Sequence, residues 1–571
     1  MRKLEQYFRK YGFLFAAFVT GAASFLVIFS SEPLHFTNIG WMMYGYQGHD
    51  IIQHQSGWMF FRNSSWTFPL GNSLDLGYPG GTPVSFTDSI PIAAIIFKLF
   101  SPFFGNNFQY FGLSVCFCLA AQGLFGAALV YYFTKKRVFS VFGSLVFIFT
   151  PMFLERCFHH TALASHWLLL AGLSLYFYGR SAPDKNIFSF LWCILLCLAE
   201  GIHPYLFIMI SGVFLLFQVE RLIWMKGRNL LRTAVDTAAC GLIVFLFGYC
   251  LGLYGKSLPP SIGFGRWNMN LNALFNPGGY NWADWSLFLD PRPYVNEIPD
   301  GTMYLGLPAL IMLPVSILIW LIFRKKRNVR IPVGLLLLLL FYTVFAFSNV
   351  ITFDEHVLFE YGLPDIILNA ANIFRASLRF FFIPYYCILL FIITMISDLF
   401  QSRSKAAVIA CLVFVCFQIM DLSPVLRDYH EYYEKKHPVW EFSDDWQALA
   451  DSYDMALSFD EISDRVIGYW LAQNHFKTNI NISAPIHLAE YWKSTEQERN
   501  RLRDALTAGT EELMKDTIYI ISDITGDERT FPDEKSLESF LTQVRNAYAG
   551  QADLLHVEDF ARSYWILCPV K

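Results

Sequence analysis

The residues best suited to chemistry lie in one segment near the N-terminus, GHDIIQHQSGWMFFRNSSWTFPLG, residues 48 to 71. The segment is too polar to cross a bilayer and too aromatic for an ordinary solvated loop. Asp50 is flanked by His49 and His54. A carboxylate at a membrane surface, partly desolvated by Trp58, can have its pKa raised and take a proton from a hydroxyl. We predict that Asp50 is a catalytic base; the alternative is an aspartate in a turn.

A second group with chemical potential is the arginine pair in FRASLRFFF. Arg375 and Arg379 are four residues apart, so a helix would place them on one face. Two guanidinium groups there could hold a phosphate through paired hydrogen bonds. The alternative is that both side chains extend to lipid headgroups. We expect a phosphate site.

Further polar residues lie in short breaks between apolar runs. Asp88, in SFTDSIP, precedes Pro91, so we expect it to cap a helix, with a second acid at the site as the alternative. The turns ERCFHH and EGIHP could form a polar wall for a sugar or hold a metal ion, which in the case of zinc needs three or four ligands. We predict no metal and no cofactor. The expected substrate pocket comprises His49, His54, Trp58, Asp88, His159, His160, Glu200 and His203.

The segment 255–302 is rich in tryptophan, asparagine, tyrosine and glycine. Aromatic faces stack on the CH faces of sugar rings, and amides bond their hydroxyls. The same composition is also typical of the aromatic belt at a membrane interface. The residues concerned are Trp267, Asn268, Asn270, Asn272, Tyr280, Asn281, Trp282 and Trp285.

The elements that must position these residues are membrane spans. The chain is 54% hydrophobic and only 16% charged, whereas soluble domains carry about 25% charged residues. A bilayer core needs roughly 20 apolar residues per helix. We predict a polytopic α-helical membrane protein over residues 1–422, with eleven spans: Phe13–Phe29, Phe111–Phe133, Val138–Leu154, Ala162–Tyr178, Ile187–Ala199, Tyr205–Leu222, Ala234–Tyr254, Met303–Phe323, Val333–Val350, Phe380–Phe400 and Ala406–Leu422.

The orientation follows from the lysines and arginines of the short loops, which favour the cytoplasm. With eleven spans, every basic cluster falls on the side of the N-terminus, beginning with Arg2 and Lys3. Residues 90–104 are apolar but short, and we expect them to lie on the outer leaflet rather than span it. The first outer loop (31–107), both polar turns, the segment 351–379 and the C-terminus then share the outer face. We therefore predict a bacterial plasma membrane protein with its polar clusters outside.

The C-terminal tail, residues 423–571, has the composition of a soluble domain. MALSF, TIYIIS and SYWILCPV predict strands, and SLESFLTQVRNAYA predicts a helix. We expect a small extracytoplasmic α/β domain. It contains only Cys568, so it can form no internal disulfide. The formal net charge of −4 does not suggest a nucleic acid partner.

The arrangement resembles the bacterial polytopic glycosyltransferases of the GT-C superfamily. The stretches HDIIQHQSGWMFFRNSSWTFPLG, YPGGTPVSFTDSIP and FRASLRFFF also look like a poorly characterised family of bacterial membrane proteins placed near that superfamily. It implies a catalytic acid at Asp50, donor phosphate binding near Arg375 and Arg379, and a polyprenyl-phosphate-sugar donor. Asp50 has no second acid within two residues, which favours a metal-independent mechanism. Leu378 stands where the resemblance leads us to expect glycine.

The sequence therefore predicts an inverting glycosyltransferase that moves a hexose or pentose to a cell-surface or lipid-linked glycan acceptor. The alternatives are a transporter or flippase for a lipid-linked glycan and a non-catalytic scaffold. A transporter needs polar groups through the depth of the membrane. The predicted spans are mostly apolar at their centres, with Gln122 as an exception.

Overall fold

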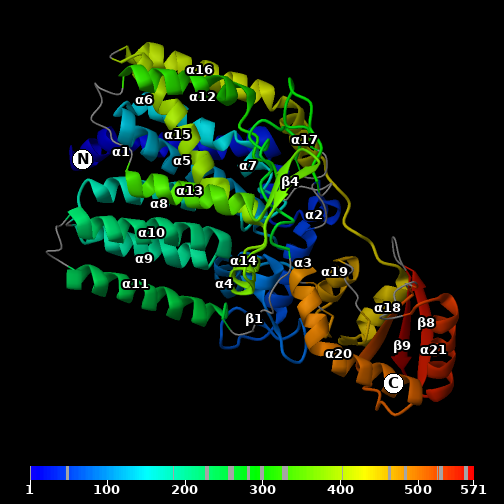
Figure 1. The fold of residues 1–571 in the computed structure, drawn as a ribbon. Helices are drawn as coiled ribbons and strands as arrows, with labels where there is room; N and C mark the ends of the chain where they lie inside the picture. The colour runs from blue at the N-terminus through cyan, green and yellow to red at the C-terminus, as the bar shows by residue number, and fades with distance from the viewer. Residues whose placement is uncertain are drawn as a thin grey trace.

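The computed structural model describes residues 2–46, 50–183, 185–224, 230–254, 263–279, 283–295, 301–323, 332–401, 403–460, 465–480, 482, 485–523, 525, 531–558 and 563–570. A body of helices that run roughly alongside one another is joined at one end to a smaller part containing a β-sheet (Figure 1). The N-terminus lies at the opposite end of the body. Polar segments and short elements gather where the two parts meet.

Six helices in the described residues are long and apolar enough to cross a membrane. The helices that contain them are α1 (Arg2–Phe29), α5 (Phe111–Thr134), α10 (Pro204–Trp224), α11 (Leu230–Leu251), α15 (Phe382–Leu399, preceded directly by η6, Ser377–Phe381) and α16 (Ser404–Asp421). Each coincides with one of the predicted spans. The chain is therefore a mostly helical protein suited to a membrane.

The prediction of eleven spans exceeds these six. The other five predicted spans coincide with shorter helices, of 12 to 17 residues. At 1.5 Å per residue, a helix of 12 residues covers about 18 Å, less than the roughly 30 Å of a bilayer core. The shortest ends before Thr150-Pro151, where a new turn begins. These helices are α6 (Arg137–Ile148), α8 (Trp167–Arg180), α9 (Ile187–Glu200), α12 (Leu307–Phe323) and α13 (Val333–Phe347).

The first long helices pack closely because glycine lies at their contact. A Cβ atom on Gly21 of α1 would come within 2.3 Å of the Leu119 carbonyl oxygen, and one on Gly123 of α5 within 2.4 Å of the Ala17 carbonyl oxygen. Small residues allow two helix backbones to approach in a membrane. α5 also packs along α6 and α8, so it forms the centre of this half of the body.

The short elements lie at the end of the body that faces the tail. They are η1 (Glu32–Leu34), α2 (Gly40–Tyr44), α3 (Asp50–Asn63), β1 (Asn72–Ser73), β2 (Thr82–Pro83), η2 (Val84–Thr87), α4 (Pro91–Leu99), η3 (Ser101–Phe103), α7 (Pro151–Leu154), β3 (Val350–Phe353), β4 (His356–Glu360), α14 (Asp365–Asn372) and α17 (Ser423–Glu434). β1–β2 and β3–β4 are antiparallel hairpins. α4 has nine residues, too few to span a bilayer.

The tail contains a five-stranded mixed sheet in the order β6-β5-β7-β9-β8. β5 pairs in parallel with β6 and β7, whereas β9 is antiparallel to β7 and β8. The three predicted strands and the predicted helix are present as β5 (Met455–Leu457), β7 (Thr517–Ser522), β9 (Ser563–Pro569) and α21 (Glu534–Ala547). The sequence analysis missed β6 (Lys477–Thr478) and β8 (Ala552–Glu558). The remaining helices are α18 (Asp444–Ser452), α19 (Arg465–Gln473) and α20 (Pro485–Ala508).

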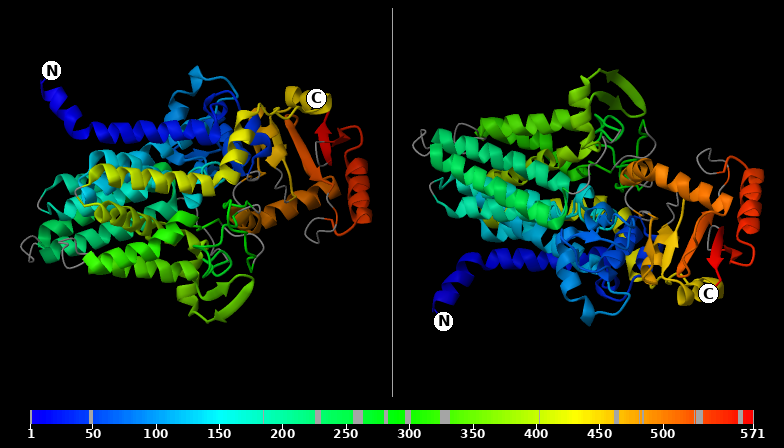
Figure 2. Two further views of the ribbon diagram at one scale, coloured as in Figure 1. Left: turned by 90° about the horizontal axis from the view of Figure 1, so that it is seen from above. Right: turned by 90° about the horizontal axis from the view of Figure 1, so that it is seen from below.

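The tail is docked on the segment that follows the first long helix (Figure 2). α19 packs against α3. The Asn63 side-chain amide donates to the Ala472 carbonyl at 3.0 Å. The backbone of Thr478 donates to Asp75 at 2.9 Å and accepts from Tyr78 at 2.8 Å. These backbone bonds fix the register between the two parts, so α19 is held beside the N-terminal end of α3.

Candidate functional site

Helix α3 presents Asp50 as its first residue. A carboxylate at this position is stabilised by the unpaired N–H groups of the helix N-terminus. The rest of the helix is enclosed on nearly all sides, from Ile51 to Phe61. Gly57 makes this possible, because a Cβ atom there would meet the Thr87 side chain at 2.2 Å. The glycine in mid-helix thus allows the turn 84–90 to lie directly on α3.

The Asp50 carboxylate is contacted from two other parts of the chain. Arg465 Nη2, from α19, donates to Oδ1 at 2.5 Å. His159 Nε2 and His160 Nε2 lie 3.6 Å and 3.9 Å from Oδ2. Burial alone would raise the pKa of Asp50, but the His159 ring and the Arg465 charge outweigh it and lower the pKa to about 2. Asp50 is therefore ionised, and its side chain remains 27% exposed.

Asp50, His159 and His160 together could offer three ligand atoms to a metal ion, all within 4.8 Å of one another. The contacts of His160 argue against this. Arg156 Nη1 lies 3.2 Å from His160 Nδ1, and a guanidinium can only donate, so Nδ1 accepts. A neutral ring then carries its hydrogen on Nε2, the atom that faces Asp50. A metal-bound histidine has the reverse arrangement, with its other nitrogen donating. The hydrogen bond from Arg156 therefore leaves His160 in a tautomer that does not suit a metal ligand.

Asp88 lies in the turn between η2 and α4 and does not cap α4, contrary to our prediction. The N-cap residue is Ile90, and no side chain caps the helix. Asp88 and Ile90 both have positive φ angles, of 54° and 52°, which is unfavourable for a β-branched residue such as Ile90. Ser89 fixes this turn by donating to the His54 carbonyl at 2.7 Å. The turn thus places Asp88 two residues before the N-cap position, where its side chain does not cap α4.

The surroundings of Asp88 connect it to the other charged groups. Burial raises the pKa of Asp88 to about 7, while the Arg379 charge lowers it and the Asp50 charge raises it further. Arg379 also helps burial to lower the pKa of His160. Asp50, Asp88, His160 and Arg379 are thus close enough to interact electrostatically. This arrangement corresponds to the alternative we gave for Asp88, a second acid at the site.

The two arginines of FRASLRFFF do not share a helix face, contrary to our prediction. Arg375 precedes η6, and only Arg379 lies in it. The Arg379 guanidinium lies over the Tyr205 ring at 4.7 Å, and that of Arg375 lies over the Trp267 ring at 4.3 Å. The chain bends between them because the Ala376 N–H donates to the Tyr205 hydroxyl at 2.9 Å. Arg379 interacts electrostatically with Asp88.

The other predicted pocket residues fall into two groups. Some lie beside Asp50, and the others support the elements around it. His54 is buried, and burial lowers its pKa to about 4, so its ring is neutral beside Asp50. Trp58 is also fully buried and donates to the Phe108 carbonyl at 3.1 Å, so it supports α3 rather than lining a cavity. His203 Nδ1 accepts from the Tyr205 N–H at 3.2 Å, and Glu200 bonds to the Tyr254 hydroxyl. His49 lies outside the described residues.

The amides of the segment 255–302 mostly serve the fold. Asn268 donates to the Val350 carbonyl, while Asn270 and Asn272 donate to Asp354, so the amides hold the β3–β4 hairpin. Trp285 is fully buried. Tyr280, Asn281 and Trp282 lie outside the described residues. Of the predicted sugar-stacking tryptophans that are described, Trp267 stacks with Arg375, one of the two predicted phosphate-binding arginines.

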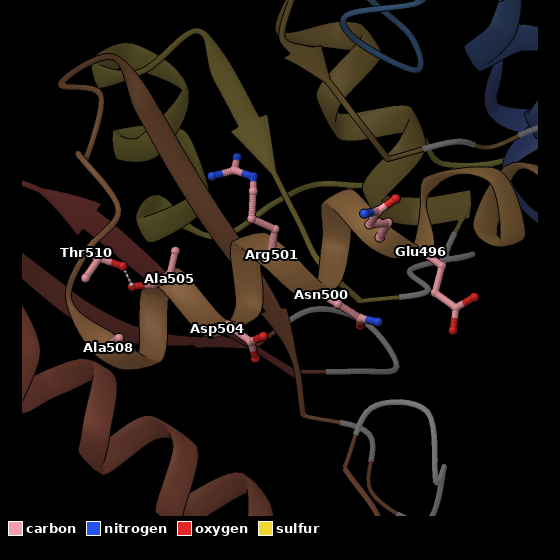
Figure 3. Close-up of a pocket in the computed structure, with 8 residues that line it drawn as sticks. Glu496, Asn500, Arg501, Asp504, Ala505, Ala508 and Thr510 are labelled. Carbon is pink, nitrogen blue, oxygen red and sulfur yellow. Dashed lines mark hydrogen bonds between the residues drawn. The ribbon is translucent and has the colours of Figure 1, made fainter.

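Sequence analysis missed Arg465, the residue with the shortest contact to Asp50. The two are 415 positions apart, and nothing in the local sequence around Arg465 marks it as functional. Tail docking alone brings it to α3. An open groove elsewhere on the tail contains none of the cluster residues (Figure 3). That groove lies on one face of α20 and is lined by Glu496, Gln497, Asn500, Arg501, Asp504, Ala505, Ala508 and Thr510.

The fold and the cluster define a class: a mostly helical protein with apolar helices of membrane-spanning length and a charged site at one end. Residues 18–423 match a protein family described as a domain of unknown function, DUF6311. Because this match covers well over half of the chain, the protein belongs to that family. The match ends at the start of α17. A comparison with curated proteins gives no match.

Proposed function

We propose that this protein is a membrane glycosyltransferase that moves a sugar from a polyprenyl-phosphate donor to a glycan acceptor on the outer face of a bacterial plasma membrane. The convergence of Asp50, Asp88 and Arg379 at one end of an apolar helical body carries the proposal. A transferase of this kind needs a base for the acceptor hydroxyl and a cation for the phosphate leaving group. It needs both where a lipid can arrive from the bilayer.

Exposed apolar side chains at the end of α4, the helix that follows the turn of Asp88, support lateral access of a lipid. α4 begins two residues after Ser89. Leu99, Phe100 and Phe103, at its C-terminal end and just after it, are 61%, 51% and 84% exposed. Large exposed apolar patches mark surfaces that contact a membrane or a partner. A donor whose tail lies in the outer leaflet would place its phosphate beside such a surface.

The distribution of basic residues supports the outer-face placement. α5 starts beside α3, since Trp58 and Gln55 both donate to the Phe108 carbonyl. Its 24 residues carry the chain about 36 Å away, to the basic turn 135–137. Basic turns favour the cytoplasm. In this orientation the N-terminus is cytoplasmic, and the cluster and the tail are extracytoplasmic.

In the proposed reaction, the acceptor oxygen bonds to the anomeric carbon from the face opposite the phosphate. The bond between that carbon and the phosphate oxygen breaks, and its electron pair leaves with the phosphate. The hydroxyl proton passes to Asp50, and Arg379 stabilises the charge on the departing phosphate. Asp88, with its pKa of about 7, is the second candidate for the base. No step requires a metal ion.

The test is a comparison of surface and lipid-linked glycans from cells with and without the gene, by mass and linkage analysis. We expect the deletion strain to lack a hexose or pentose that the wild type carries. Identical glycans in the two strains would contradict the proposal. Transport of a lipid-linked glycan is the alternative: its loss would remove whole glycan chains from the surface while the completed lipid-linked precursor accumulates inside.

A further inference from the structure

The contact between Arg465 and Asp50 leaves most of the arginine unused. A guanidinium has five N–H donors in a planar fork that fits a phosphate. Of the described residues, only Asp50 accepts a hydrogen bond from Arg465. The side chain is 28% exposed, so part of it is open to a ligand. Arg465 is therefore held at one oxygen, with capacity for a second anionic partner.

Asp50 in this state is poorly prepared for the reaction proposed above. Paired with Arg465 and contacted by His159, its carboxylate has a pKa of about 2 and is a weak base. Removal of the arginine from Oδ1 would expose that oxygen and strengthen its basicity. The donor phosphate, a diester, shares one negative charge between two oxygens, and both can accept hydrogen bonds from the planar fork of a guanidinium. It is the partner for which Arg465 would exchange its contact with the single oxygen of Asp50.

We propose that Arg465 is a donor-binding residue supplied by the tail, which exchanges Asp50 for the phosphate of the polyprenyl-phosphate donor when that donor enters. This inference rests on the proposed function and names the role of the tail within it. Without donor, the acid and the arginine neutralise each other. With donor, Arg465 joins Arg379 on the phosphate, and Asp50 Oδ1 becomes free for the acceptor hydroxyl. Donor binding thus prepares the base.

The geometry of docking supports a fixed role for the tail. Asn63 and Ala472 bond at the far ends of α3 and α19, and the Thr478 backbone is bonded to Asp75 and Tyr78. α19 therefore holds its first residue, Arg465, beside the first residue of α3. A short movement of one side chain, rather than of the domain, is enough for the exchange.

Equilibrium binding of polyprenyl phosphate to the purified full-length protein in nanodiscs tests this exchange. Arg465→Gln should weaken the affinity about tenfold or more, and Arg465→Lys should give an intermediate value. Arg501→Gln is the matched control, because Arg501 is a 68% exposed tail arginine paired with Glu511. It should leave the affinity unchanged. Inorganic phosphate and phosphatidylglycerol, as separate probes, show whether the site requires the prenyl chain or takes any phosphate.

The decisive readout is a double-mutant cycle. Asp50→Asn should tighten polyprenyl phosphate binding several-fold, because it releases Arg465 and removes a repulsive charge. In the Arg465→Gln background the gain should shrink, since only the repulsion remains. Equal gains in both backgrounds, or wild-type affinity in Arg465→Gln, would overturn the inference and leave the proposed function intact. A wild-type protein without affinity for polyprenyl phosphate would contradict both. If Arg465→Gln lowers the melting temperature, Arg465→Lys replaces it in the cycle.

Discussion

Asp50 and Asp421 are two acids in the same part of the fold, and they differ in burial and in the groups that contact them. Asp421, the last residue of α16, is completely buried. Its carboxylate accepts hydrogen bonds from the Ser286 hydroxyl at 2.5 Å, the Tyr304 hydroxyl at 2.8 Å and the Leu307 N–H at 2.7 Å. Asp50 is partly exposed and is contacted by an arginine and two histidines, all of which can also bind a ligand.

The comparison shows that the two acids differ in their hydrogen-bonding partners as well as in their burial. Asp421 ties the segment 286–307 to α16, and its oxygens are fully used by neutral donors fixed in the fold. Asp50 is surrounded by groups with donors to spare, among them Arg465. Buried polar groups that are fully bonded make a fold specific. A site, in contrast, keeps hydrogen-bonding capacity for its substrate.

The largest expected effect on stability follows from removing the structural acid. Asp421→Ala leaves buried donors of Ser286, Tyr304 and Leu307 without their acceptor, at a cost of about 2–4 kcal/mol. We expect a lower melting temperature and a lower yield of folded protein in detergent. Asp504→Ala, at an exposed acid on α20, is the control and should change neither. A melting temperature unchanged by Asp421→Ala would contradict the structural role.

Gly57→Ala tests the contact that brings the turn of Asp88 onto α3. The added methyl group would collide with Thr87, so the turn 84–90 must shift, at a cost of about 1–3 kcal/mol. We expect transfer activity to fall together with stability. Gly241→Ala in α11 is the control, because a Cβ atom there meets nothing within 4 Å. This variant should be neutral or slightly more stable than the wild type. Equal behaviour of the two alanine variants would show that the close approach is unimportant.

The two arginines near η6 should differ in their effect on the donor. Arg379→Gln removes the guanidinium that faces Asp88 and should raise the donor KM about tenfold, which corresponds to about 1.4 kcal/mol. Arg375→Gln removes a guanidinium stacked on Trp267 and should raise it much less. Steady-state kinetics with varied donor concentration measures both. A larger effect of Arg375→Gln would reverse the assignment derived from the structure.

The last prediction concerns Asp88 and pH. Its pKa is raised to about 7 in the folded state, against about 3.9 in an unfolded chain. Between these values the unfolded state ionises and the folded state does not, so wild-type stability falls as pH rises from about 4 to about 7. Asp88→Asn lacks this dependence. The melting temperature of the variant minus that of the wild type should rise over this range and then level off; a constant difference would contradict the shift.

The sequence was sufficient for the elements that depend on local composition. Long apolar runs predicted the six long helices, and alternating apolar residues predicted β5, β7 and β9. The sequence was insufficient where the turns of the chain determine how long a helix or strand is. Five predicted spans are shorter helices because turns such as the one before Pro151 interrupt the apolar runs. The exposed strand β8 and the two-residue β6 carry little pattern of their own.

The sequence predicted most residues of the candidate site but not their arrangement in space. Asp50, His159, His160 and Arg379 were named from residue type and position, and the fold brings them together. Asp88 was assigned to a cap because its neighbours fit that role, yet a left-handed backbone at Ile90 puts the cap elsewhere. Arg465 could not be found, because tertiary docking across 415 positions alone places it.

The most direct test of the account is Asp50→Asn, expressed in a strain that lacks the chromosomal gene. Asparagine nearly preserves the shape of the side chain and removes its charge and basicity. We predict that the variant accumulates in the membrane at the wild-type level, with a melting temperature close to that of the wild type. Its glycans should equal those of the deletion strain. Wild-type glycans in cells that carry only the Asp50→Asn protein would contradict the central claim.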